Sequence, residues 1–462
     1  MIVTFLLGII GLGLMVFIHE LGHFVAAKMN GVEVETFALG WGPRLVGFKR
    51  GGTMYQISWF PIGGYCKMKG ELVPGIAGGG GEAAAAAETE KVKGSFLSAA
   101  PWRRIVIAAF GPLFNLVFAF IIFAIIWGVG FSLYSTDNRV ILATDYSLND
   151  FRTPPPAQVA GLKTGDRVVA IDGAPVEKFQ DILEKVSVAP GRKFTFTVER
   201  VENGAPRTLR LSMAPELDKD SGAGRIGIYA WVDPVVDSVT RGSAAAIAGL
   251  RKGDRIVSAN DRPVLNSMDM QAVLGGKPQR LLVDFDREGK RESASLVLVY
   301  DEKGSPNLGI TFAARVYHTP RLGVGGALAK SADETWSTVT LTIKGIGLLF
   351  QGIKLRNAVA GPLRITYYIG TAATSELQLG FWAGLVSFFR ILSFLSVVLF
   401  LMNLLPIPAM DGGQIILFLV EIGRGRPVRS RLIWRLQMIG FSLLIMLSLY
   451  VTFSDVLFFM GK

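Results

Sequence analysis

Long apolar runs alternate with polar segments along the 462-residue chain. Four runs are long enough to cross the roughly 30 Å of hydrocarbon in a bilayer as helices. They predict transmembrane helices within residues 1–30, 101–133, 377–413 and 432–460. A fifth run, within residues 330–376, is interrupted by Lys344 and by several Thr, Ser and Gly residues. This run predicts an amphipathic helix that lies on the membrane or in a groove.

The composition agrees with a membrane protein that also has water-facing domains. The chain is 50% hydrophobic and 18% charged, which is too apolar for a soluble protein and too charged for membrane helices alone. A single cysteine, Cys66, excludes a disulfide-stapled secreted scaffold. The formal charge of +11 could indicate nucleic-acid binding, but in a membrane protein excess Lys and Arg mark cytoplasmic loops and lipid head groups. We therefore expect contact with membrane lipids and no nucleic-acid partner.

Basic residues between the spans set the expected orientation. They cluster in the loop between the first two spans, and again from Arg424 to Arg431 between the last two. By the positive-inside rule, both loops face the cytoplasm and both termini lie outside. The long segment between the second and third spans is then extracytoplasmic. Within the first loop, residues 75–100 contain runs of Gly and Ala and predict a flexible cytoplasmic linker.

The extracytoplasmic segment contains an internal repeat. Residues 160–176 align without a gap with residues 248–264, and each copy has a helix end stopped by Gly, a Gly-Asp turn and short strands. Two copies predict two small α+β domains in tandem and not a solenoid, which needs three or more units. We place the two domains at residues 139–220 and 225–316.

The repeated pattern Ala-Gly-Leu-x-x-Gly-Asp resembles the PDZ domain. A Gly-Ile pair after each copy, at Gly227 and at Gly309, resembles the carboxylate-binding strand of a bacterial, circularly permuted PDZ domain. The resemblance implies a groove that captures an extended chain at a sheet edge. The alternative is that both domains are spacers whose grooves are unused.

The candidate chemistry lies at the end of the first span, in the sequence His19-Glu20-Leu-Gly-His23. Residues four apart share one face of a helix, so both imidazoles can bind one Zn²⁺. Glu20 is placed to take a proton from a water at the metal. Zinc is favoured over magnesium or calcium because those hard ions prefer oxygen ligands. The alternative is a pair of core histidines beside a buried acid, but ionisable groups in an apolar span are costly unless they bind something.

A catalytic zinc needs a third protein ligand and one open position. His318 lies far outside the spans and is expected at the surface. We therefore expect a carboxylate at matching depth in another span, where Asp411 is the only acid between Arg390 and Glu421. Two prolines just before it break the helix, which a membrane tolerates only where protein or water satisfies the freed backbone groups. The alternative is a solvated Asp at a simple helix end.

The chain resembles the site-2 protease family of intramembrane zinc metalloproteases. The resemblance rests on His-Glu-x-x-His in the first span, Asn-x-x-Pro-x-Pro-x-x-Asp-Gly in a later one and PDZ-like domains between them. The two PDZ-like copies look most like the family's bacterial regulator-of-sigma-E proteases. The resemblance implies that His19, His23 and Asp411 bind the zinc. It also implies that Glu20 is the general base and that Asn403 contacts the substrate backbone.

Residues 31–74 resemble the family's membrane-associated β-hairpin loop. Two strand-like runs are separated by Gly and Pro turns, and Gly63 and Gly64 follow the second run. The resemblance implies that this loop, including Gly63 and Gly64, pairs with a substrate helix as it unwinds. The alternative is an ordinary cytoplasmic hairpin. The Gly111-Pro112 pair, at the start of the second span with Asn115, also resembles a family signature, and we expect this pair to serve close packing.

Together these patterns predict a polytopic α-helical membrane protein with four transmembrane helices, a cytoplasmic-side membrane-associated β-hairpin loop and two extracytoplasmic PDZ domains in tandem. The resemblance implies a multi-pass protein of the bacterial inner membrane, with periplasmic PDZ domains and an active site near the cytoplasmic side. It implies hydrolysis of a peptide bond within or near the membrane segment of a single-span, anti-sigma-factor-like protein. An upstream site-1-type protease would first trim that substrate, and the PDZ domains could exclude untrimmed ectodomains by size.

Two other functions remain open on the sequence alone. The first is a non-catalytic membrane scaffold whose PDZ domains bind exposed C-termini, against which the intact metal motif argues. The second is a membrane zinc protease of the quality-control type, a class that lacks PDZ domains.

Overall fold

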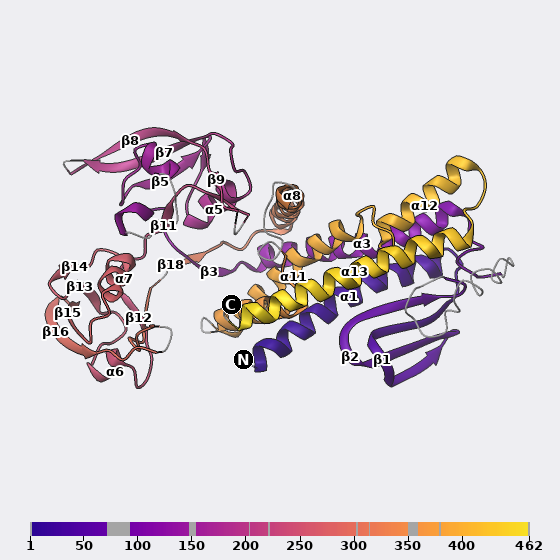
Figure 1. Ribbon diagram of the computed structural model, residues 1–462, viewed down its shortest axis with the longest axis horizontal. Helices are drawn as coiled ribbons and strands as arrows, with labels where there is room; N and C mark the ends of the chain where they lie inside the picture. Colours follow the sequence, from indigo (N-terminus) through magenta and orange to yellow (C-terminus); the bar gives the residue numbers. More distant parts are fainter. Residues whose placement is uncertain are drawn as a thin grey trace. The chain divides into compact units, whose positions relative to one another are not determined.

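The computed structural model describes residues 2–71, 93–146, 154–202, 204–219, 222–301, 304–313, 315–349, 359–377 and 380–460. The chain divides into two compact units, one of Met1–Phe131 with His318–Lys462 and the other of Ser132–Tyr317 (Figure 1). Most of the predicted linker, residues 75–92, lies outside the described residues.

Among the described residues, four helices of the first unit are long and apolar enough to cross a membrane, and they lie at the four positions where the sequence predicts spans. Helix α3 contacts α1, α8, α11 and α12, so it is the common packing partner in this unit. The helices are α1 Ile2–Met29, α3 Pro101–Val129, α8 Val324–Leu349, α10 Pro362–Glu376, α11 Phe381–Asn403, α12 Asp411–Arg424 and α13 Ser430–Phe459.

The predicted amphipathic region forms α8 and α10, and α8 begins earlier than expected. Helix α8 packs on α3 and α11, where Val339 is buried. The Glu334 carboxylate of α8 accepts hydrogen bonds from Trp127 of α3 and from Arg390 of α11. These contacts agree with the expectation of a helix held in a groove of the protein.

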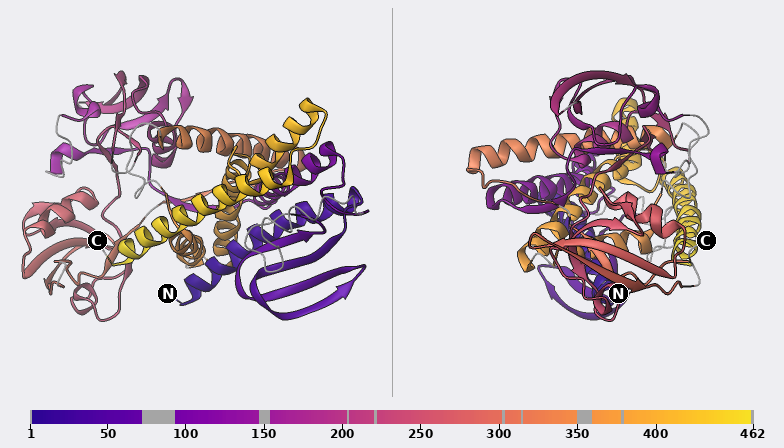
Figure 2. Two further views of the ribbon diagram at one scale, coloured as in Figure 1. Left: turned by 45° about the vertical axis from the view of Figure 1, so that its right-hand side comes forward. Right: turned by 90° about the vertical axis from the view of Figure 1, so that its left-hand side faces the viewer.

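An antiparallel sheet packs against α1 in the region expected to form a hairpin (Figure 2). It is more elaborate than predicted, because Leu39 pairs with both Ile57 and Gly64, so that two parts of the second strand flank the start of the first. Gly40 and Gly63 have φ values of 84° and 91°, a conformation that favours glycine. The strands are β1 Val34–Arg50 and β2 Thr53–Met68.

The second unit contains two four-stranded antiparallel sheets, of order β6-β5-β7-β8 and β14-β13-β15-β16. Each copy of the repeat builds its own sheet and its own apolar core. The first copy comprises α4 Pro156–Val159, β5 Arg167–Ile171, β6 Ala174–Pro175, α5 Phe179–Ser187, β7 Phe194–Glu202 and β8 Ala205–Met213. The second comprises α6 Ala244–Ile247, β13 Arg255–Ala259, β14 Arg262–Pro263, α7 Ser267–Gly275, β15 Arg280–Arg287 and β16 Lys290–Val297.

Short strands complete the two copies by pairing residues far apart in sequence. Strand β11 pairs with β4, and β17 pairs with β12. These and the other short elements are β3 Ser132–Ser135, β4 Val140–Leu142, the 3₁₀ helix Ala143–Tyr146, β9 Glu216–Leu217, β10 Gly224–Arg225, β11 Ile228–Ala230, β12 Val236–Val239, β17 Ile310–Phe312 and β18 Arg315–His318.

The Gly-Asp turn of the repeat buries a carboxylate in both copies. Asp166 accepts two hydrogen bonds from Arg200, and Asp254 accepts two from Arg287, at 2.7–2.8 Å. Both aspartate side chains are only 1% exposed. A buried charge needs a partner, so the bidentate ion pair explains why the repeated turn carries Asp.

Asp254→Ala should lower the free energy of unfolding of the second copy by about 3 kcal/mol, because it leaves Arg287 without its buried partner. The measurement is protease resistance of this copy at increasing urea. Asp237→Ala is the control, since Asp237 makes an exposed ion pair with Lys252 that is worth less than about 1 kcal/mol. Equal loss of resistance in both variants would show that the buried pair does not stabilise the turn.

Candidate metal centre

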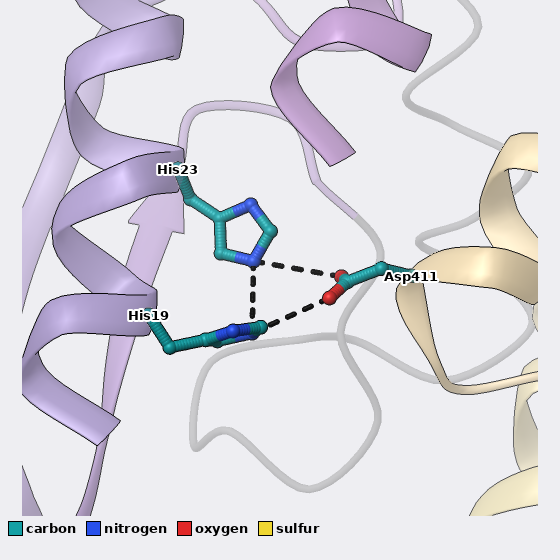
Figure 3. Close-up of side chains that lie close together, drawn as sticks. All are labelled: His19, His23 and Asp411. Carbon is teal, nitrogen blue, oxygen red and sulfur yellow. Dashed lines mark hydrogen bonds and ion pairs between the residues drawn. The ribbon is translucent and has the colours of Figure 1, made fainter. Parts of the chain in front are cut away.

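The three predicted metal ligands come together in the first unit. His19 and His23 lie on one face of α1, and Asp411 is the first residue of α12 (Figure 3). Their ligand atoms all lie within 4.8 Å of one another. His19 Nε2 lies 3.2 Å from His23 Nε2, and the two Asp411 oxygens lie 3.3 and 3.5 Å from these nitrogens.

A sharp turn between α11 and α12 brings Asp411 to the histidines. Helix α11 ends at Asn403, and Ala409 within the turn has a φ of 82°, which non-glycine residues rarely adopt. A Cβ on Gly412 or on Gly413 would lie 2.3 Å from a backbone carbonyl oxygen of this turn. Glycine is therefore required directly after Asp411 for the turn to pack against the start of α12.

Groups on α3 orient both imidazole rings. His23 Nδ1 donates a hydrogen bond to the backbone carbonyl of Ile107 at 2.9 Å. The fully buried Asn115 amide lies 3.3 Å from His19 Nδ1. His23 therefore donates through Nδ1 and turns its Nε2 towards Asp411, as outer-shell partners of metal ligands commonly arrange. The Nε2 of His19 also faces Asp411. The contact of Asn115 with His19 was not predicted from the sequence.

The donor set fits zinc. Two Nε2 atoms and a carboxylate are electron-rich groups that face one point, an arrangement that a cation stabilises. Two imidazoles and one carboxylate are ligands that zinc accepts, and they leave a fourth position open. Cys66 lines the same cavity, but burial raises the pKa of its thiol and keeps it protonated. It therefore lacks the thiolate that binds a metal.

The ligands border a cavity of about 280 Å³. Of the other predicted site residues, Glu20, Asn403 and Gly64 line this cavity. Gly63 lies outside the lining and packs against the indole of Trp41. His318 is exposed on β18, in agreement with the expectation that it is a surface residue.

Three further polar residues line the cavity and were not singled out from the sequence: Glu71, Gln414 and Gln437. Gln437 lies within a membrane-spanning helix, and a polar side chain in an apolar span is the signal that could have identified it. Glu71 and Gln414 lie in more polar surroundings, where the sequence offers no such contrast.

A buried ion pair ties α12 to α3. Arg104 of α3 contacts Glu421 of α12, and their side chains are only 5% and 2% exposed. The Arg104 guanidinium also lies over the ring of Phe418. Loss of either charge would leave the other buried without a partner. The ion pair thus holds the helix that begins with Asp411 against the helix that orients His23.

Residues 7–447 match the model of "Peptidase family M50". The chain belongs to peptidase family M50. It is 34% identical over 463 residues to a "Putative zinc metalloprotease" of Treponema pallidum, with 99% of both chains covered. It is 28% identical over 468 residues to "Regulator of sigma-E protease RseP" of Escherichia coli, with 97% of both chains covered.

Membership of family M50 confirms the resemblance to the site-2 proteases that the sequence showed. The chain is therefore a zinc metalloprotease, and its cofactor is Zn²⁺. This result favours an enzyme over the non-catalytic scaffold. Family membership and the four apolar helices together show that the chain is a membrane protein.

Gly111 of α3 leaves the space that His23 occupies, because a Cβ there would lie 2.2 Å from His23 Nε2. Gly111→Ala should displace the imidazole and weaken zinc affinity at least roughly tenfold. The measurement is zinc retained per mole of protein after dialysis against a graded chelator.

Gly128→Ala is the matched control on the same helix, since its Cβ would meet only Ala327, at 3.9 Å. Zinc retention in this variant should equal that of the parent protein. If Gly111→Ala also retained zinc at the parent level, His23 would not be a ligand.

Proposed function

We propose that this protein hydrolyses a peptide bond within or near the transmembrane segment of a single-span membrane protein. One observation carries the proposal: His19 and His23 lie on a helix apolar enough to span a membrane, and they meet Asp411 at a cavity of that unit. Ionisable groups in such a helix are costly, and a protease for soluble substrates has no need to place them there.

The residues at the cavity divide the chemistry between them. His19, His23 and Asp411 would hold the zinc, which when bound would supply Lewis acidity to the scissile carbonyl and to water. Glu20 follows His19 and lines the cavity, so its carboxylate accepts the proton of the attacking water and donates it to the leaving amine. Asn403 lines the same cavity, where its amide hydrogen-bonds to the substrate backbone.

The edge of β2 supports an extended substrate conformation. In the described structure, residues 64–68 pair with β1 along one side. Gly64 and Tyr65 line the cavity, and a Cβ on Gly64 would lie 3.6 Å from Glu20 Cγ. A substrate chain that pairs with this edge as an added strand would bring its peptide bonds beside the general base.

The second unit fits two PDZ domains, at residues 139–220 and 225–316. Helix α5 and residues 223–229 line a cavity of about 300 Å³ in the first copy. Strand β11, which begins at this wall, pairs with β4 along one edge in the described residues. Its other edge is then available for an extended chain, as in the groove that the resemblance implies.

The basic loops support a cellular location for the protein, and the name of one relative supports a class of substrate. The basic loops support a bacterial inner-membrane protein with extracytoplasmic PDZ domains and a metal site near the cytoplasmic side. The name of the Escherichia coli relative, a regulator of sigma-E protease, supports a substrate that resembles an anti-sigma factor. An upstream site-1-type protease would trim that substrate before it reaches the cavity.

Glu20→Gln should keep zinc but cleave a model single-span substrate at least about 100-fold more slowly, because an amide cannot accept the proton of the water. Cleavage and zinc per mole are measured on the same preparation. Glu33→Gln is the control, since Glu33 makes an exposed ion pair with Lys69. The Glu33→Gln protein should cleave the substrate at the parent rate. Near-normal cleavage by Glu20→Gln would remove this residue from the mechanism.

A further inference from the structure

Three polar side chains that take no part in metal binding share one wall of the metal cavity. Glu71 follows β2, Gln414 lies on α12 and Gln437 lies on α13. The same three also line a small neighbouring pocket. We call them the polar rim, because they lie where the two spaces meet. The other walls of the small pocket are apolar and are formed by Phe96, Leu97, Leu417, Phe418 and Ile433.

Gln437 has an unsatisfied amide in an apolar helix. Its side chain is 7% exposed, and its Oε1 has no hydrogen-bond partner among the described residues. A buried amide oxygen without a donor costs free energy. A polar group that a span keeps at this cost is a candidate for binding a ligand.

The rest of the polar rim provides both donors and acceptors. The Glu71 carboxylate accepts the backbone N–H of Met68 at 3.3 Å. Burial raises the pKa of Glu71 to about 7. The amide of Gln414 offers an acceptor oxygen and a donor nitrogen. None of these groups is needed to hold zinc or to activate water.

We propose that the polar rim is a substrate subsite, and that Gln437 Oε1 accepts a hydrogen bond from an N–H or O–H donor of the extended substrate. The proposal rests on the proposed function, because the donor belongs to the unwound chain in the cavity. Two sources supply this chemistry: a backbone N–H that unwinding frees, and the hydroxyl of a small polar side chain. The polar rim binds the substrate away from the reacting bond, so its loss should weaken substrate binding and leave the rate of the chemical step unchanged.

The test measures substrate binding to full-length, zinc-loaded protein that carries Glu20→Gln and therefore does not cleave. The probes are two synthetic peptides, each with about 20 mostly apolar residues, which is enough for one span. One peptide has Ser at two central positions and the other has Ala there. Gln437→Met keeps the length of the side chain and removes its hydrogen bonds.

Gln437→Met should raise the Kd about tenfold, the effect of one lost buried hydrogen bond. A backbone donor predicts this rise for both peptides, and a side-chain donor predicts it for the Ser peptide alone.

Gln414→Met should shift the Kd in the same direction. Ser442→Ala, on the exposed face of α13, should leave the Kd unchanged. In protein with Glu20 restored, Gln437→Met should raise KM and change kcat by less than about twofold.

An unchanged Kd for both peptides in Gln437→Met would overturn the subsite. A loss of zinc in that variant would also overturn it, because Gln437 would then support the metal site and not the substrate. Failure of the parent protein to cleave either peptide would count against the proposed function alone, since the binding comparison does not depend on cleavage.

Discussion

Polar groups among apolar helices must find most of their partners inside the protein, because the surrounding hydrocarbon offers none. The metal ligands are such a group, with electron-rich atoms only 3.2–3.5 Å apart. A second is the ion pair of Arg364 and Asp455, in which the fully buried Asp455 also accepts the backbone N–H groups of Gly361 and Arg364 at the start of α10. Each set of partners comes from different helices, so the interactions that compensate the charges also fix the helices relative to one another.

Close helix contact makes these partners reachable, and glycine permits the contact. A Cβ on Gly22, between the two histidines, would lie 2.2 Å from the carbonyl oxygen of Phe110 on α3. Nearer the N-terminus of α1, a Cβ on Gly8 would lie 1.9 Å from the carbonyl oxygen of Thr366 on α10. Small residues at such positions let helix backbones approach in membrane proteins. The α1–α3 contact explains how His23 reaches a backbone carbonyl of another helix.

The four apolar helices and the cluster of candidate metal ligands could be predicted from the sequence, mostly from local patterns. Apolar length predicts a membrane helix, and a spacing of four places His19 and His23 on one face. Asp411 followed from the chemistry of zinc together with the position of the only nearby acid. Partners set by packing were not predictable in this way: Arg200 lies 34 positions after Asp166, and the double pairing of Leu39 depends on how two strands bend. The polar rim was missed for the same reason, since three separate elements form it.

The central claim is that two imidazoles and one carboxylate hold the zinc. X-ray absorption at the zinc edge of the purified, metal-loaded protein tests this claim most directly. The account predicts only nitrogen and oxygen neighbours, at about 2.0–2.2 Å, with the multiple-scattering signature of two imidazole rings. A sulfur neighbour at about 2.3 Å, or the signature of a single imidazole, would contradict it.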